Sequence, residues 1–203
     1  MTRSIRLSLL ALVLVVAAAL IAGFGYETVG RRRDRARVPR IGEAIDIGGR
    51  RLNLFCSGTG TPTVILFPGA SQPGFSWSHI QPQLARLTRS CWFDRAGEGW
   101  SDPGPYPRTS SATAADLRAA LSKAAVPPPY VLVGHSLGGL DARVFHYLYP
   151  GEVAGMVLAD AAHEEEPRRA PASMLGRTAP RWLWRTLHFG FSAAARFGLI
   201  RLL

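Results

Sequence analysis

Cysteine and histidine are scarce in this sequence, which has 203 residues but only two cysteines and five histidines. These residues and the surrounding carboxylates form no cluster at the spacing that metal ligands require. We therefore predict no metal site and no bound cofactor. No segment repeats at a fixed period, which argues against a repeat architecture. The length suits a single globular domain with a sizeable core.

Acidic residues are nearly absent from the two ends of the chain. The first 40 residues contain eight arginines against Glu27 and Asp34, and the segment after Glu166 contains seven arginines and no acid. The middle contains nine basic and twelve acidic residues, so the net charge of +10 resides in the ends. A slightly acidic middle predicts no nucleic-acid-binding face. The basic ends indicate either contact with anionic lipid headgroups or a solvated linker.

One long apolar run, Leu7–Phe24, is interrupted only by a serine. As a helix, its eighteen residues would span roughly 27 Å, enough to cross the hydrocarbon core of a bilayer. Two preceding arginines and the alanines at 17–19 also suit a cleaved secretory signal, although the length favours a membrane anchor. The orientation stays open, because the positive-inside rule would keep the arginine-rich flank Arg31–Arg40 cytoplasmic.

The middle of the chain alternates between patterns typical of strands and of helices. A glycine turn at Gly48 and Gly49 predicts a hairpin, and the apolar run Thr63–Ala70 predicts a strand buried on both faces of a sheet. Further strands are expected at 90–94, 130–134 and 153–160, and helices at 77–87, around 117–121 and at 140–148. This alternation predicts an α/β fold with a mostly parallel sheet and helices on both faces.

A serine flanked by glycines lies between the fifth strand pattern and a helix pattern. Gly134, Ser136 and Gly138, with His135 between them, match the G-x-S-x-G pattern of a nucleophile elbow in the strand-to-helix context that the pattern requires. Small residues two positions either side allow the sharp turn that exposes the hydroxyl. The N–H of Leu137 would begin the helix, where unpaired donors favour a developing oxyanion.

A second oxyanion donor is expected in the loop after the earlier buried strand. In "FPGASQPGFSW", Gly69 allows close approach of the backbone, and the N–H of Ala70 is the expected donor. The alternative is that "PGAS" is merely a turn.

Four motifs in order, "VILFPGAS", "WFDRAGEGWSD", "VLVGHSLGG" and "GMVLADAAHEEE", resemble the α/β-hydrolase superfamily, in particular its serine hydrolases with an N-terminal membrane segment. The resemblance extends from about Ile45 to Glu166. It implies that Ser136 is the nucleophile for a small ester-like substrate, that Leu137 and Ala70 supply the oxyanion hole, and that the Asp94–Asp102 loop braces the site. Many relatives have His-Gly where this chain has Pro-Gly before Ala70.

The partners of the serine are harder to find. In this fold an acid and then a histidine follow the nucleophile on loops after later strands. The loops that usually provide them are not recognisable here, so the resemblance implies an incomplete or inactive enzyme. Asp160 and His163 offer a short alternative acid and base, whereas His135 suits packing better. The alternative function is a truncated, non-catalytic membrane-associated or partner-binding module.

The resemblance also bears on the two cysteines. Cys56 and Cys91 would lie on neighbouring strands in the sheet order of the family, so a disulfide is geometrically possible and would imply an extracytoplasmic domain. Two buried thiols are the alternative. We thus expect a membrane-anchored domain outside the cytoplasm, or else a secreted one.

Four parts are therefore expected along the chain. They are an anchor or signal in 1–25, a basic linker in 26–42, a C-terminally incomplete hydrolase core in 43–166 and a partial helical cap in 167–203. Basic and polar residues recur at helical spacing between Arg181 and Arg196, which predicts an amphipathic basic helix. That helix would be an orphaned cap helix, a cover for the sheet or a membrane-surface helix. The oligomeric state is not predicted.

Overall fold

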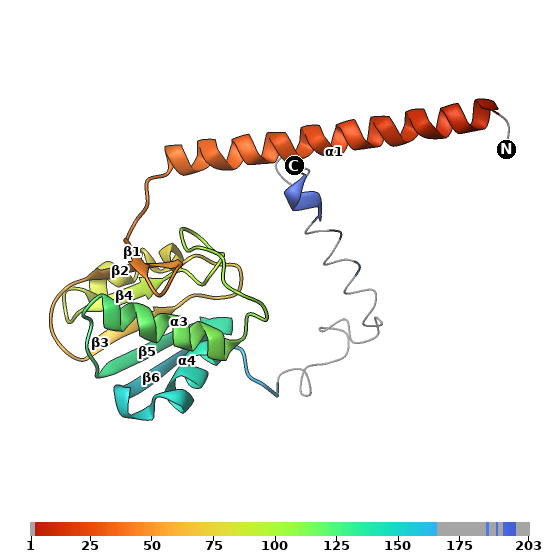
Figure 1. Ribbon diagram of the computed structural model, residues 1–203. Helices are drawn as coiled ribbons and strands as arrows, with labels where there is room; N and C mark the ends of the chain where they lie inside the picture. Colours follow the sequence, from red (N-terminus) through yellow and green to blue (C-terminus); the bar gives the residue numbers. More distant parts are fainter. Residues whose placement is uncertain (1–2, 166–185, 187–189, 191–192, 198–203) are drawn as a thin grey trace. The chain divides into compact units, whose positions relative to one another are not determined.

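The computed structural model describes residues 3–165, 186, 190 and 193–197 (Figure 1). The chain divides into two units, one of Met1–Pro39 with Ala170–Leu203 and the other of Arg40–Arg169. Most of the predicted partial cap, including most of the predicted helix between Arg181 and Arg196, lies outside the described residues.

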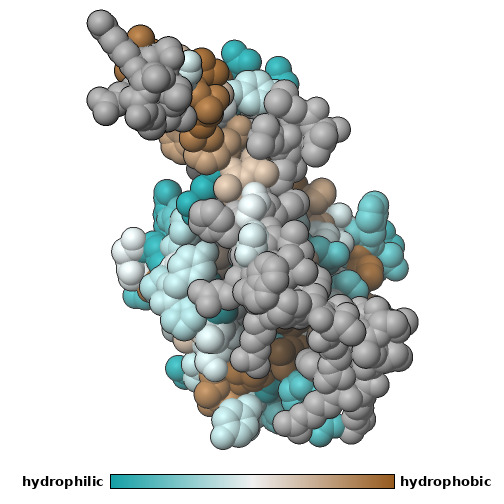
Figure 2. Space-filling model, turned by 90° about the vertical axis from the view of Figure 1, so that its right-hand side faces the viewer, coloured by the Kyte–Doolittle hydropathy of each residue, from teal (hydrophilic) through white to brown (hydrophobic). Residues whose placement is uncertain are grey.

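The first unit contains one long helix, α1 (Arg3–Arg37). Its segment Leu10–Asp34 is long and apolar enough to cross a membrane, by length and composition. Apolar side chains along α1 are exposed and form brown areas in Figure 2. The helix continues well past residue 25, through much of the segment expected to be a linker. Its extension contains no proline, and Glu27 pairs with Arg31 one turn later at 2.7 Å, an arrangement that supports helix.

The second unit is built on one six-stranded sheet in the order β1-β2-β4-β3-β5-β6 (Figure 1). The strands are β1 (Glu43–Asp46), β2 (Arg51–Ser57), β3 (Thr63–Phe67), β4 (Ser90–Phe93), β5 (Tyr130–Ser136) and β6 (Val153–Ala161). Strands β4, β3, β5 and β6 run parallel, whereas β1 and β2 form the antiparallel edge. The prediction of a mostly parallel sheet is confirmed.

The hairpin between β1 and β2 has the turn that its glycines predict. Gly48 and Gly49 have φ angles of 103° and 80°, which L side chains rarely adopt. The Asp46 carboxylate accepts both of their N–H groups, at 2.8 and 3.1 Å. The aspartate therefore stabilises a turn that the two glycines make sterically possible.

Helices cover both faces of the sheet, as predicted. One face carries α3 (Ser110–Lys123) and α4 (Leu137–Leu148) (Figure 1). The other carries the 3₁₀ helix η1 (Gly74–Trp77) and α2 (Gln81–Leu84). A further 3₁₀ turn, η2 (Pro150–Glu152), leads into β6. Strand β3 is buried along its whole length, because its alternate side chains contribute to the core on both faces.

The helix expected at 77–87 is wrong in extent. The structure has a 3₁₀ turn and then the four residues of α2, and Leu87 is 83% exposed. Pro82, in the first turn of α2, lacks an N–H, so a helix arriving from residue 77 cannot continue through it with an unbroken hydrogen-bond ladder.

A disulfide joins the antiparallel and parallel parts of the sheet. Cys56 of β2 and Cys91 of β4 are direct cross-strand partners, and their sulfur atoms are bonded. Of the two alternatives that the sequence leaves open, the structure contains the bonded one. The bond closes a loop with a sequence separation of 35.

Reducing this disulfide should lower the stability of the second unit. Because the bond constrains the unfolded chain, we expect its loss to decrease the free energy of unfolding by about 2–4 kcal/mol. Chemical denaturation of the protein with and without reductant measures the change. The double variant Cys56→Ala with Cys91→Ala should match the reduced protein and be insensitive to reductant. Alkylation of both thiols without reductant would contradict the bond.

Candidate active site

Ser136 lies at the turn between β5 and α4. It is the last residue of β5 and the N-cap of α4, with φ 51° and ψ −124°. A positive φ at a residue other than glycine is strained and is often found at functional sites. The side chain is only half-buried. The turn therefore presents a hydroxyl at the carboxyl edge of the parallel strands.

The glycines around Ser136 are needed because backbones approach each other closely here. A Cβ at Gly134 would lie 2.5 Å from the Cα of Gly139, and a Cβ at Gly138 would lie 2.3 Å from the Phe67 carbonyl oxygen. Real Cβ atoms do not tolerate such distances. The small residues thus let α4 begin directly against β5 and the end of β3.

The two backbone N–H groups that the sequence predicts as oxyanion donors belong to Leu137 and Ala70. Leu137 is the first residue of α4, so its N–H has no acceptor within the helix. Ala70 is exposed just after β3, and its N–H has no hydrogen-bond acceptor among the described residues. Strands β3 and β5 are parallel neighbours with Phe67 opposite Gly134. Both donors therefore belong to the same edge of the sheet.

The loop that carries Ala70 is held by its own side chains and by its neighbours. The Gly69 N–H donates to Gln72 Oε1 at 3.2 Å, and the backbone N–H of Gln72 donates to the Gly69 carbonyl at 3.4 Å. A Cβ at Gly69 would lie 3.0 Å from His135 Nδ1, so the half-buried imidazole lies against this loop. His135 thus packs beside the elbow.

Asp94 holds together the loop after β4, which belongs to the Asp94–Asp102 segment. Its carboxylate is fully buried and accepts from the N–H groups of Gly74 and Trp100, at 2.7 and 2.9 Å, and from Asn53 Nδ2 at 3.0 Å. Hydrogen bonds to the charged form offset the loss of hydration. A Cβ at Gly99 would lie 2.3 Å from this carboxylate, so the loop closes tightly around it.

At the far end of that loop, Asp102 ties the segment to β2. The backbone N–H of Arg51 donates to Asp102 Oδ2 at 2.9 Å, and the guanidinium Nε of Arg51 donates to it at 3.2 Å. These hydrogen bonds lower the pKa of the Asp102 carboxyl from its ordinary value.

The sequence reasoning missed Arg95 and its partner Asp141. Both side chains are buried, with 8% and 3% exposed, and Arg95 Nε donates to Asp141 Oδ2 at 2.7 Å. The remaining guanidinium nitrogens donate to the carbonyl oxygens of Gly69 at 2.8 Å and Pro68 at 2.5 Å. The sequence places Asp141 among the buried positions of α4. Because a buried carboxylate requires a partner, this aspartate could have predicted a buried cation nearby.

Glu98 also belongs to this cluster. Burial raises the pKa of its carboxyl above the ordinary value, while Arg95 lowers it less strongly. Arg95 Nη1 lies 3.6 Å from Glu98 Oε2, an oxygen that is buried without a hydrogen-bond partner in the described part of the chain. Its carboxyl also interacts with the backbone of Ser71 in the loop after β3.

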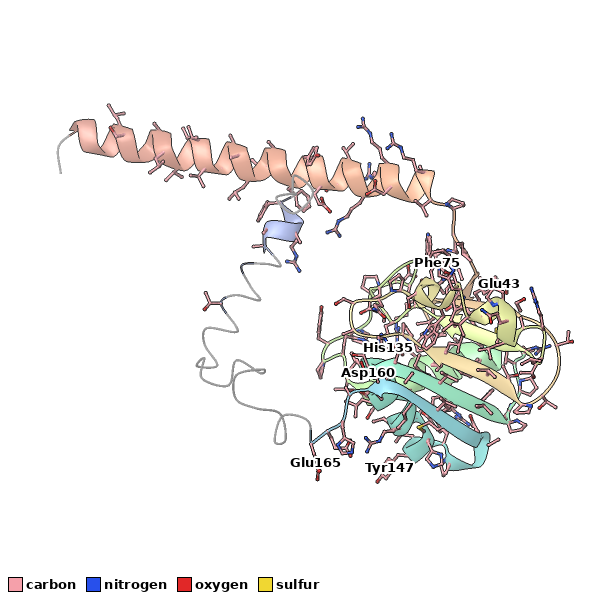
Figure 3. All side chains as sticks on the ribbon, turned by 180° about the vertical axis from the view of Figure 1, so that it is seen from behind. Glu43, Phe75, His135, Tyr147, Asp160 and Glu165 are labelled. Carbon is pink, nitrogen blue, oxygen red and sulfur yellow. A yellow bond between two sulfur atoms is a disulfide. The ribbon has the colours of Figure 1, made fainter. Side chains whose placement is uncertain are left out.

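Asp160 is the last residue but one of β6, the strand next to β5, and His163 follows that strand. Asp160 is exposed, has φ 45° and lies at a register shift between β5 and β6 beside Ser136. The Ser136 carbonyl accepts the N–H of Ala162 at 2.9 Å. His135 and Asp160 lie at the same end of these strands (Figure 3). His163 Nδ1 accepts the Glu165 N–H at 3.1 Å. In the described part of the chain, no hydrogen bond joins His163 to Asp160 or Ser136.

No group of three or more His, Cys, Asp or Glu side chains in the described ranges is placed to hold a metal ion. The geometry of the edge instead combines a half-buried serine hydroxyl with backbone N–H donors on two adjoining elements. That combination is suited to stabilising negative charge on an oxygen beside the hydroxyl.

Comparisons with known proteins agree with this fold. Residues 62–201 match the family model described as alpha/beta hydrolase fold. The uncharacterized protein YbdG of Bacillus subtilis is 27% identical over 155 residues, which cover 75% of this chain and 47% of that protein. An uncharacterized vacuolar membrane protein of Saccharomyces cerevisiae is 35% identical over 108 residues, 51% of this chain and 17% of that protein.

A solved structure supports the same placement. The meta-cleavage product hydrolase from Pseudomonas fluorescens IP01 is 25% identical with a TM-score of 0.55, over 60% of this chain and 46% of that chain. The present chain thus spans less than half the length of each relative named here. Because the family model matches most of the chain and the solved hydrolase shares its fold, the protein belongs to the α/β-hydrolase family.

Proposed function

We propose that the protein is a serine hydrolase that cleaves ester-, thioester- or amide-type bonds of a small-molecule substrate through Ser136. The observation that carries this proposal is the strained backbone of Ser136 at the start of α4, with φ 51°. A turn of this kind is costly unless the surroundings enforce it, and here glycines and a neighbouring strand do so. Membership of the α/β-hydrolase family supports the reaction class.

The proposed chemistry proceeds in two steps. Ser136 Oγ attacks the carbonyl carbon, its proton passes to a general base, and the carbonyl oxygen takes the negative charge. The N–H groups of Leu137 and Ala70 stabilise that oxyanion. Collapse of the intermediate releases the protonated leaving group, and water then hydrolyses the acyl-enzyme to regenerate the hydroxyl.

The general base is the open part of this mechanism. Within the described residues, Asp160 and His163 are the alternative acid and base that the sequence offers, but the imidazole of His163 is not arranged for that role. A neutral imidazole that accepts at Nδ1, as His163 does from Glu165, carries its proton at Nε2. With Nδ1 occupied by the Glu165 N–H and Nε2 carrying the proton, neither nitrogen is free to accept the Ser136 proton while the other donates to Asp160.

That observation favours a second candidate function, a non-catalytic membrane-associated or partner-binding module that retains the elbow. The two functions differ in one property, the reactivity of the Ser136 hydroxyl. The substrate of the serine hydrolase is proposed only as a class, because the chain spans less than half of the relatives compared with it.

We also infer that α1 anchors the protein in a membrane, with a cleaved signal as the alternative. An 18-residue window of its segment Leu10–Asp34 has a mean hydropathy of 2.1, and none of that window is buried. A relative named as a vacuolar membrane protein supports this inference. The Cys56–Cys91 disulfide favours an oxidising compartment for the second unit, and hence an extracytoplasmic domain.

A fluorophosphonate probe tests the nucleophile directly, because it reacts with an activated serine hydroxyl and releases fluoride. The proposal expects labelling of the full chain and its complete loss in Ser136→Ala. The matched control is Ser122→Ala, which removes an exposed serine of α3 and should label like the parent protein. A parent protein that is folded but not labelled would contradict the hydrolase proposal and favour the non-catalytic module.

Replacement of His163 tests the alternative base. Because Nδ1 of His163 accepts the Glu165 N–H, we expect the His163→Ala variant to react with the fluorophosphonate probe and to hydrolyse a nitrophenyl ester at the parental rates. His146→Ala, which removes another exposed histidine, serves as the control. A fall of about 100-fold or more confined to His163→Ala would instead identify this imidazole as the base.

Deletion of residues 1–39 tests the anchor. The full chain should sediment with membranes and stay there after alkaline carbonate extraction, whereas the shortened chain should be soluble. A full-length protein found entirely in the soluble fraction, with its N-terminus intact by mass spectrometry, would contradict anchoring. An N-terminus removed during export would identify the segment as a cleaved signal.

A further inference from the structure

The Arg95 guanidinium connects the two elements that carry the proposed oxyanion donors. It lies just after β4, where Nε donates to Asp141 of α4 at 2.7 Å and Nη1 and Nη2 donate to the carbonyls of Gly69 and Pro68 at 2.8 and 2.5 Å. The side chain is 8% exposed. Burying a charge in this way is costly unless it is paired and hydrogen-bonded. The arrangement meets both conditions.

The bond to the Gly69 carbonyl has a consequence for Ala70. The peptide unit between these residues is planar, and in a trans unit the C=O and the N–H point in opposite directions. The cis peptide bonds of the described chain lie elsewhere. When Arg95 holds the Gly69 oxygen, the Ala70 N–H must therefore point away from the guanidinium. This is the N–H that has no acceptor among the described residues.

The same guanidinium also fixes the helix that carries the other donor. Asp141 lies five residues after Ser136, in the second turn of α4, and its carboxylate is 3% exposed. The first turn of α4 packs against the same loop, because a Cβ at Gly138 would lie 2.5 Å from the Pro68 carbonyl oxygen. One side chain thus holds both the Ala70 peptide and the helix that begins with Leu137.

We propose that Arg95 is the positioning residue of the oxyanion hole, which orients the Ala70 N–H and sets its distance from the Leu137 N–H. This inference rests on the proposed function of the same edge. It accounts for the choice of arginine, whose planar fork donates to a carboxylate and to two carbonyls at once. A lysine ammonium at this position would pair with Asp141 but could not hold both carbonyls in the same plane.

Two variants separate positioning from simple stabilisation. In Arg95→Lys, a charge remains for Asp141, and we expect the second-order rate of fluorophosphonate labelling at Ser136 to fall about 10- to 100-fold, less than the loss of a whole donor. The control Arg118→Lys alters an exposed arginine that pairs with Glu152, and it should label at the parental rate. Parental labelling in a folded Arg95→Lys protein would overturn the proposal.

A nuclear magnetic resonance measurement reads the Ala70 peptide without any catalysis. Gly69–Ala70 is the only glycine–alanine pair in the sequence, so carbonyl-¹³C glycine with ¹⁵N alanine isolates the Ala70 amide signal of the full chain in detergent micelles. We expect this signal to shift beyond its linewidth in Arg95→Lys and to stay unchanged in Arg118→Lys. An unchanged signal in Arg95→Lys would overturn the proposal.

The two readouts keep this inference distinct from the proposed function. If the parent protein is not labelled at all, the hydrolase proposal fails and the Ala70 signal alone decides the role of Arg95. If Arg95→Lys does not fold, the variant Arg95→Met with Asp141→Leu removes both buried charges together and leaves neither unpaired. We expect this double variant also to show a shifted Ala70 amide signal and slower fluorophosphonate labelling of Ser136. A parental chemical shift together with a parental labelling rate would overturn the proposal.

Discussion

The close approach of α4 to the end of β3 is the constraint on which the rest of this edge depends. Gly138 lies where a side chain would clash with the carbonyl oxygens of Phe67 and Pro68. The helix therefore begins directly beside the loop that carries Ala70, and Ser136 must take a positive φ to connect β5 to it. Strain at one residue is compensated by the packing of the strand and helix around it.

Two consecutive charged residues after β4 make this arrangement rigid. Asp94 collects N–H donors from loops on one side, and Arg95 donates to carbonyls and a carboxylate on the other. Each is buried, and the partners of each include backbone groups of segments distant in sequence. The loops after β3 and β4 and the start of α4 are thus held by one polar network, whose members are costly to remove singly because each would leave a buried partner unpaired.

The site is asymmetric in what the described residues provide. The proposed nucleophile and oxyanion donors adjoin the ends of β3 and β5 and the start of α4, whereas Asp160 and His163 are exposed at the end of β6 and after it. Burial decreases across this side of the sheet, since Val64 is buried and Val157 of β6 is 53% exposed. The proposed nucleophile therefore lies nearer the densely packed strands than the candidate acid and base do. The candidate base, His163, lies where the packing is less dense, and its Nδ1 accepts the N–H of Glu165.

The sequence alone determined the features that depend on residues close together in the chain. The glycines around Ser136, the buried strand β3 and the hairpin at Gly48 follow from local sterics and from periodicity, and the structure contains all three. Local patterns failed at residues 77–87, where Pro82 interrupts an otherwise helical spacing. Only the tertiary structure decided that Cys56 bonds to Cys91 and that Arg95 meets Asp141, 46 residues away. Such contacts depend on sheet order and on which buried charge finds a partner, and no local pattern specifies either.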